Sequence, residues 1–406
     1  MLRRLFVAIH RWFGLGAAAF LFVSGLTGAI ISWDHEIDAW LNPELHVART
    51  QGPALPALEL ARRVEAADPR VRVTYMPLAT EPGEAFGVFV EPRVDAATGK
   101  PHDVDYNQVA VDPATGAIQG RRFWGAVSLA RQDLLPFLYR LHYSMHLPAI
   151  GAYDTGMLLM GIIAIAWVFD TLIALWISFP NMSAWRRSFA FRWRSGGHRF
   201  VFDLHRSGGV WLFLLVLMIA VTSVSMNLEQ QVMRPVVSLF SPLAPSPYAL
   251  PEGASAPASG DPAISTTQAI AVAREEAVRR GLHAPAGGLL YSSLTGRYGV
   301  GFFEPGHDHG DGGLGNPWIY LDASTGIVAQ AVVPGEGSAG DIFMQAMFPL
   351  HSGRILGFGG RVLMSLMGLA VATFSVTGVL LWARKRKARL HARAQARVPR
   401  GGPATA

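Results

Sequence analysis

Four stretches of the chain contain few or no charged residues over lengths that suit membrane crossing. They cover residues 12–32, 155–179, 207–228 and 362–383, and Asp170 is the one ionisable residue inside them. A helix rises about 1.5 Å per residue, so about 20 apolar residues cross a hydrocarbon core of about 30 Å. The pattern therefore predicts four transmembrane helices. The first stretch is too long for a secretory signal and ends without a small-x-small cleavage site, so we expect an uncleaved anchor.

Two long segments, 34–140 and 229–345, alternate between helical and strand-like patterns instead. Each begins with a helical pattern, "ALPALELARRVEAA" and "TTQAIAVAREEAVRRG", and continues with a strand-like one, "EAFGVFVEP" and "RYGVGFFEP". Each closes on Asp-x-x-Thr-Gly between β-branched runs, in "VAVDPATGAIQG" and "IYLDASTGIVAQ". This spacing predicts a hairpin in which glycine supplies a positive φ. The stretch "SPYALPEGASAPASGDPA" predicts a mobile linker.

The two halves of the chain share these motifs at a nearly constant offset. Asp112 matches Asp322 at an offset of 210, and His142 matches His351 at an offset of 209. "IHRWFG" before the first apolar stretch likewise matches "LHRSGG" before the third. We therefore expect a duplicated helix–module–helix unit, a parallel repeat whose pseudo-two-fold axis lies along the membrane normal.

Charge adds an orientation to this picture. The net charge of +6 is concentrated before the first apolar stretch, between the second and third, and after the fourth. Basic residues favour the cytoplasmic side, so both termini should be cytoplasmic and both long segments should lie on the opposite side of the membrane. The charges follow the membrane ends and no nucleic-acid motif accompanies them, so we expect the lipid bilayer and no nucleic acid as a partner. The absence of cysteine excludes disulfides, thiolate metal sites and covalent c-type haem.

The predicted fold class is a membrane protein: a four-transmembrane-helix bundle with two periplasmic α+β modules. The expected boundaries are transmembrane helices at 5–33, 141–179, 205–228 and 346–384, modules at 34–140 and 229–345, a basic cytoplasmic loop at 180–204 and a basic tail at 385–406.

Four histidines occupy duplicated positions beside the predicted helices. The repeat pairs His10 with His205 at the inner side and His142 with His351 at the outer side. Two neutral imidazoles that face each other across a bundle can supply both axial ligands of one haem iron. A single interfacial histidine is more often only an anchor, but the duplicated set favours two bis-histidine b-type haems, one near each membrane surface.

Neighbouring residues extend the candidate site. Arg11, Arg206 and Arg354 could pair with haem propionates, although the first two also fit the positive-inside pattern. His146 lies four residues after His142, which predicts the same helix face, and leaves it open as the outer ligand or as a propionate or substrate contact. Asp170 could accept the ring N–H of an inner histidine or bond another helix.

Other polar motifs have weaker functional interpretations. The loop "EPGHDHGDGG" could bind a metal through His307 and His309, but a flexible polar loop is the favoured interpretation, and His198 is expected to be exposed. We find no P-loop, dinucleotide-binding or nucleophile-elbow motif. Reducing equivalents would therefore come from a cytoplasmic reductase or from membrane quinol.

Taken together, the motifs "HRWFGL…SGLTG", "DLHR…G" and "PLHSG…GR…SVTGVLLW" resemble the PepSY-associated transmembrane proteins, and the modules with "VDPATG" and "LDASTG" resemble PepSY domains. The resemblance covers about residues 5–388. It implies an iron-regulated inner-membrane haem protein similar to the reductases that release iron from ferric siderophores in the periplasm.

The expected function is electron transfer through two haems to a periplasmic acceptor, with ferric iron in a siderophore as the first candidate. The protein would then be a haem-dependent ferric-siderophore reductase. The alternative is a membrane-anchored PepSY protein that binds peptides or proteases without redox chemistry. A metal or siderophore transporter fits less well, because four helices with a single buried acid make a poor transport path.

Overall fold

The computed structural model of the chain describes residues 1–151, 153–249, 261–310 and 312–396. It divides into two compact units. The first, which we call the helical unit, comprises Met1–Ala29, Leu141–Leu228 and Met364–Ala406. The second, the sheet unit, comprises Ile30–Arg140 and Glu229–Leu363. The central part of the predicted linker, residues 250–260, lies outside the described residues.

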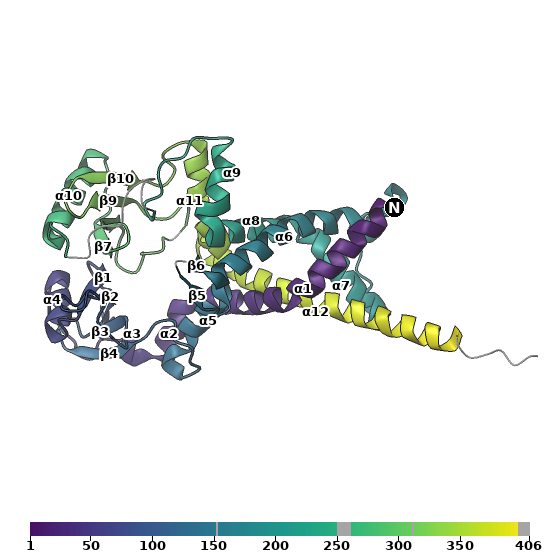
Figure 1. Cartoon of the computed structure of the whole chain (residues 1–406), viewed down its shortest axis with the longest axis horizontal. Coiled ribbons are helices and arrows are strands. Elements are labelled where there is room, and N and C mark those ends of the chain that lie inside the picture. Colours follow the sequence, from purple (N-terminus) through teal and green to yellow (C-terminus); the bar gives the residue numbers. More distant parts are fainter. Residues whose placement is uncertain (152, 250–260, 311, 397–406) are drawn as a thin grey trace, which may run out of the picture. The chain divides into compact units, whose positions relative to one another are not determined.

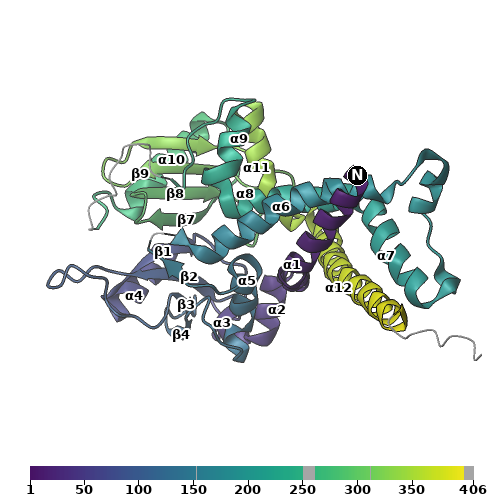
Figure 2. The same ribbon diagram turned by 45° about the vertical axis from the view of Figure 1, so that its right-hand side comes forward.

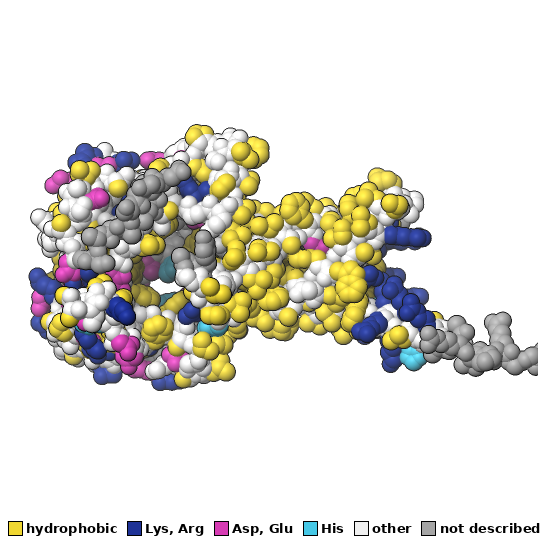
Figure 3. Space-filling view, viewed as in Figure 1, with side chains coloured by type: hydrophobic (Ala, Val, Ile, Leu, Met, Phe, Trp, Pro, Cys, Tyr) yellow, Lys and Arg dark blue, Asp and Glu magenta, His cyan; other side chains and the backbone are white. Residues whose placement is uncertain are grey.

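Four long apolar helices dominate the helical unit (Figure 1): α1 (Leu2–Ile31), α6 (Thr155–Ser178), α8 (Phe213–Leu228) and α12 (Gly357–Ala396). Each contributes to a span long and apolar enough to cross a membrane. Figure 3 shows hydrophobic side chains covering these helices, with Lys and Arg gathered at the end where α1 begins. The protein is therefore a membrane protein with transmembrane helices, as the hydrophobic pattern predicts.

Small residues bring α1 and α12 into contact. A Cβ added to Gly25 would lie 2.6 Å from the carbonyl oxygen of Gly368, and one added to Gly368 would lie 2.4 Å from that of Gly25. Ala372 and Ala29 stand four residues further along their helices, so each helix presents a small-xxx-small pair at the crossing. Such pairs allow the close backbone approach that stabilises helices in lipid.

His10 lies within the spanning helix α1, whereas His142, His205 and His351 lie on separate helices that precede the spanning ones. α5 (Leu134–Ser144) is followed by the short strands β5 (Ala149–Ile150) and β6 (Tyr153–Asp154) before α6 begins. α7 (Gly197–Trp211) precedes α8, and α11 (Ala339–Ser352) with the 3₁₀ turn η5 (Arg354–Leu356) precedes α12. Glycine explains the last break, because Gly353 and Gly357 adopt positive φ values of 77° and 58°.

Eight antiparallel strands form one continuous sheet in the sheet unit, in the order β10-β9-β8-β7-β1-β2-β3-β4 (Figure 2). The first four are β1 (Val71–Pro77), β2 (Phe86–Pro92), β3 (Gln108–Val111) and β4 (Ile118–Arg122). The others are β7 (Ala286–Ser292), β8 (Arg297–Phe302), β9 (Trp318–Asp322) and β10 (Val328–Val332). The two sets meet at β1 and β7, where Met76 lies opposite Leu289. Each set thus closes one edge of the other, which removes two exposed strand edges.

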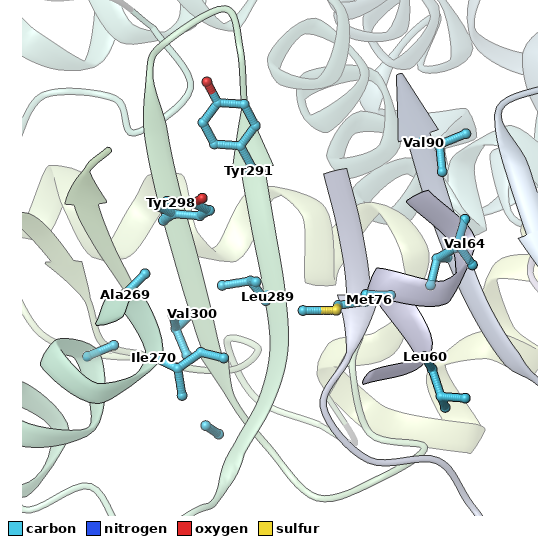
Figure 4. Packing of buried hydrophobic residues seen from close by; sticks show 14 of the residues in the cluster. Leu60, Val64, Met76, Val90, Ala269, Ile270, Leu289, Tyr291, Tyr298 and Val300 are labelled. Carbon is cyan, nitrogen blue, oxygen red and sulfur yellow. The ribbon is translucent and has the colours of Figure 1, made fainter. Parts of the chain in front are cut away.

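One amphipathic helix packs against each half of the sheet, α4 (Ala57–Ala67) on the first and α10 (Thr266–Arg279) on the second. Their apolar side chains join those of the strands in a single buried cluster, part of which Figure 4 shows. Leu60 and Val64 of α4 are each 1% exposed. The unit also contains three short helices, α2 (Asp34–Leu41), α3 (Pro43–His46) and α9 (Arg234–Ser238), the 3₁₀ turn η1 (Arg131–Asp133) and the π-helix η4 (Glu229–Met233).

The two Asp-x-x-Thr-Gly hairpins have the predicted turn and the same internal contacts. Asp112 Oδ1 accepts hydrogen bonds from the backbone and side chain of Thr115, and Asp322 Oδ1 accepts the same pair from Thr325. Gly116 and Gly326 adopt φ values of 74° and 76°, which residues with a Cβ rarely tolerate. The motif is therefore structural, because aspartate and glycine are both needed to close the turn.

Candidate functional site

The structure brings His10 and His205 together in the helical unit. His10 lies in α1 and His205 in α7, and their ring centroids are 6.0 Å apart with an interplanar angle of 49°. These residues are 195 positions apart in the sequence. The packing of the helices therefore brings together two imidazoles that are far apart in the sequence.

Asp170 of α6 fixes the orientation of the His10 ring. Its two carboxylate oxygens lie 3.1 and 2.9 Å from Nδ1 of His10. A carboxylate only accepts hydrogen bonds, so Nδ1 carries the proton and donates it. In the neutral ring Nε2 is then the unprotonated nitrogen, the form in which imidazole binds a metal. Of the two contacts considered for Asp170, the structure therefore shows the one with an inner histidine, His10.

Thr377 of α12 does the same for His205. Its Oγ1 lies 3.0 Å from Nδ1 of His205 and also 2.7 Å from the carbonyl oxygen of Thr373. The hydroxyl donates to that carbonyl, so it accepts the hydrogen bond from the imidazole. Among the described residues, no hydrogen-bond partner contacts Nε2 of His10 or His205. Both rings therefore present the same nitrogen for ligation.

His142 has a comparable environment in the helical unit. Its Nδ1 lies 2.9 Å from the backbone carbonyl of Ser24 and 3.2 Å from Oγ1 of Thr27. The Thr27 hydroxyl donates to the carbonyl of Val23 at 2.8 Å, so Nδ1 of His142 must again be the donor. A Cβ on Gly28 would lie 2.9 Å from Cε1 of this ring, so only glycine admits the imidazole here.

The inner pair fits a bis-histidine metal centre. Metal–imidazole bonds are about 2 Å long, so two imidazoles on opposite sides of one iron have centroids about 6 Å apart. Gly14 and Gly209 stand four residues after His10 and His205, and a Cβ on either would meet nothing within 4 Å. Open space therefore lies one helical turn beyond each histidine. The protein could hold a haem iron through Nε2 of both rings.

The position of His146 contradicts the expected placement on the helix of His142. α5 ends at Ser144, and Met145 and His146 adopt left-handed φ values of 51° and 53°. These values terminate the helix, so His146 does not lie one turn above His142 on the same face. His351 and Arg354 belong to the sheet unit, in α11 and η5. The pairing of His142 with His351 stays a prediction.

The two inner arginines lie beside their histidines but contact other groups. The Arg11 guanidinium lies over the Trp12 ring at 5.1 Å. Arg206 donates to the backbone carbonyl of Arg187 and lies 5.0 Å from the centre of the Phe202 ring. In the sheet unit, Arg354 lies 3.9 Å from Asp34. The Nε atoms of Arg11 and Arg206 are buried without a hydrogen-bond partner in the described part of the chain.

The histidine-rich loop of the second module has no metal-site geometry among its described residues. His309 Nδ1 lies 2.7 Å from Asp308, and Asn316 binds the carbonyl oxygens of His307 and Asp308. No group of three or more His, Cys, Asp or Glu residues within the described ranges is arranged to hold a metal ion. Asp311 lies outside those ranges. His198 is exposed, as expected.

Sequence reasoning did not assign roles to the oxygen atoms that hold the rings, or to a buried ion network in the sheet unit. Thr27–Gly28 and Thr377–Gly378 each place a hydroxyl and a glycine beside a histidine, and the repeated Thr-Gly pair was the sequence signal that could have indicated these contacts.

In the sheet unit, Asp38 binds Arg122 and His46. Burial would raise the pKa of Asp38, but these hydrogen bonds outweigh it and hold the pKa well below its usual value. This network fastens α2 and α3 to β4.

A comparison with known families supplies an independent result. The family model of the PepSY-associated TM region matches residues 7–385, which is nearly the whole chain. A search of curated proteins found no match.

Proposed function

The chain belongs to the PepSY-associated transmembrane family, and from this premise we propose that it is a two-haem electron-transfer protein of the bacterial inner membrane. Its termini face the cytoplasm, and the sheet unit, built from two copies of one PepSY-like module, faces the periplasm. The reaction we propose is reduction of a periplasmic acceptor, with ferric iron in a siderophore as the substrate. A cytoplasmic reductase or membrane quinol is the donor.

The observation that supports this proposal is the facing pair His10 and His205, with a hydrogen-bond acceptor at each Nδ1. An interfacial anchor histidine needs neither a partner imidazole nor a fixed tautomer. A bis-histidine metal centre needs both, because two imidazoles bind the same metal and each Nε2 must be unprotonated and correctly oriented. Bound haem would supply one-electron redox chemistry.

The protein residues differ in how they would tune this centre. Asp170 places a full negative charge behind His10, whereas Thr377 places a neutral hydroxyl behind His205. A carboxylate partner makes the imidazole a stronger donor to the metal, which favours the oxidised state. His142, held by the Ser24 carbonyl, would ligate the outer haem together with His351.

The choice of acceptor follows from the direction of charge movement and from iron chemistry. Moving one electron outward across the membrane is favourable by about 2.3 kcal/mol per 100 mV. Reduction makes iron softer and weakens its binding to the hard oxygen ligands of a siderophore. An outward electron path therefore releases iron where the siderophore arrives.

The first experiment is an absorption spectrum of the full chain, oxidised and then reduced with dithionite. We expect a low-spin b-type spectrum with two haems per chain. His10→Ala and His205→Ala should each remove one haem and leave the other, and the exposed His198→Ala should keep both. Protein from haem-replete cells that lacks a Soret band would refute the proposal. Retention of both haems in the two alanine variants would refute the pairing.

A second measurement tests the acceptor. Dithionite-reduced protein, freed of excess reductant, should be reoxidised by a ferric siderophore under anaerobic conditions, with one ferrous iron formed per electron. Gallium-loaded siderophore is the matched control, since gallium(III) has no accessible divalent state. Equal reoxidation rates with the iron and gallium complexes would contradict reduction of the bound iron.

A further inference from the structure

The segment between α6 and α7 is folded firmly against α7. Ser207 donates to the carbonyl of Ala190 at 2.8 Å, and the indole N–H of Trp211 donates to the carbonyl of Phe189 at 3.0 Å. Arg192 binds both carboxylate oxygens of Asp203 at 2.7 Å each. These contacts fix the loop residues in place relative to the helix.

A cavity lies between this loop and α7. Its volume is about 420 Å³, and it is lined by Arg187, Ala190, Arg192 and Arg206. The volume falls within the range of about 300–1,000 Å³ that is typical of small-ligand pockets. Three of the four lining residues are arginines, which is unusual because like charges repel at close range.

The charges around this cavity do not balance. Asp203 is completely buried, binds Arg192, and lies 3.8 Å from Arg206. Within the described residues no carboxylate pairs with Arg187, and the buried Nε of Arg206 has no hydrogen-bond partner. Three guanidinium groups thus face one carboxylate, which leaves two positive charges and unused N–H donors.

We propose that this cavity binds a phosphate group, carried either by an anionic lipid headgroup or by a soluble phosphate. A phosphate monoester carries a charge of about −1.5 to −2 at pH 7, which offsets the excess. Arginine presents its N–H groups as a planar fork that matches phosphate oxygens. The ligand therefore satisfies both the charge and the open donors of Arg187 and Arg206.

The surroundings allow the phosphate to come from a lipid. Trp185, Trp193 and Trp211 are 44%, 68% and 63% exposed around this loop. Tryptophan prefers the level of the lipid headgroups, where its ring contacts acyl chains and its N–H contacts polar groups. A cavity at that depth is within reach of lipid phosphates.

The test uses the full chain with its haem content unchanged. Native mass spectrometry measures retention of phosphatidic acid and of phosphatidylcholine by the wild type, Arg187→Gln and Arg194→Gln. Arg187 is exposed and lines the cavity, whereas Arg194 lies in the same loop, loses the same charge and does not line it. We expect retention of phosphatidic acid to fall about tenfold in Arg187→Gln and to stay unchanged in Arg194→Gln. Haem absorbance should not change in either variant.

Competition with inorganic phosphate separates the two sources. Displacement of phosphatidic acid by millimolar phosphate indicates a site for soluble phosphate, and failure to displace it indicates a lipid headgroup site. Equal losses in both variants would overturn the proposal, because net charge alone would then explain binding. Equal retention of the two lipids by the wild type would overturn it as well. Loss of haem instead of lipid from Arg187→Gln would assign the cavity to a propionate and refute phosphate binding.

Discussion

Single oxygen atoms determine the protonation of the candidate ligands. The Asp170 carboxylate, the Thr377 hydroxyl and the Ser24 carbonyl each accept the Nδ1 proton of a different histidine. The chemical types differ, but each leaves Nε2 unprotonated. These hydrogen bonds at Nδ1 are the strongest support for the proposal that the histidines bind a metal.

Removing one such oxygen should weaken haem binding without touching a ligand. Thr377→Val keeps the side-chain shape but removes the hydroxyl that accepts from the buried N–H of His205 and leaves only the backbone of Phe374 beside that ring, so we expect haem affinity to fall about 10- to 100-fold. Thr377→Ser keeps the hydroxyl and serves as the control. Haem transfer to a competing haem-binding protein measures the affinity. Equal transfer rates in the valine and serine variants would argue against a role for this hydrogen bond.

The closeness of His10 and His205 could be predicted from the sequence, but most of the groups that hold the histidine rings could not. The duplicated spacing identified His10 and His205, and the cost of a carboxylate in an apolar helix singled out Asp170. Thr27 and Ser24 lie more than 110 residues from His142, and helix periodicity does not specify which helix faces which. The local break at Met145–His146 was missed because the preceding pattern stays helical in composition.

At the scale of elements, glycine positions decide which helices can touch. Gly25 and Gly368 allow the backbones of α1 and α12 to meet, and Gly161 admits the side chain of Leu228 where α6 packs on α8. His10, the Thr27 contact and Thr377 all lie on α1 or α12. The α1–α12 crossing therefore influences the geometry around both His142 and His205.

A side chain at the crossing should separate the two helices. In Gly25→Leu the Cβ would collide with the Gly368 carbonyl, and we expect destabilisation of about 1–3 kcal/mol or more. Gly359→Ala, on α12 with nothing within 4 Å of the added Cβ, is the control and should be neutral or slightly stabilising. Thermal unfolding in detergent measures both. Similar transition temperatures for the two variants would show that the crossing tolerates bulk.

At the scale of the whole molecule, the sheet unit is a single compact body. The strands and hairpins were predictable from alternation and turn residues, as β2, β8 and both Asp-x-x-Thr-Gly turns demonstrate. The pairing of β1 with β7 could not be predicted, because alternation specifies which face of a strand is buried but does not specify which strand pairs with its edge. This pairing joins both hydrophobic faces into one core.

Because the two halves of the sheet share one hydrophobic core, a destabilising substitution in either half should also destabilise the other half. Leu60→Ala in α4 removes a buried side chain, and we expect a loss of about 2–5 kcal/mol. Hydrogen exchange should then lose protection in β8 and β9 as well as in β1 and β2. The control is Val278→Ala, because the Val278 side chain of α10 is 77% exposed. Loss of protection confined to the first four strands would mean that the two halves open independently.

The inner histidine pair also has a consequence for biogenesis. His10 emerges from the ribosome early, Asp170 and His205 follow after about 160 and 195 residues, and Thr377 belongs to a helix made after all of these. A nascent chain that has inserted three spans therefore presents His205 without the oxygen that sets its tautomer. The environment of His205 is completed only when α12 joins the bundle, so a chain with three inserted spans lacks an arrangement on which the proposed haem binding depends.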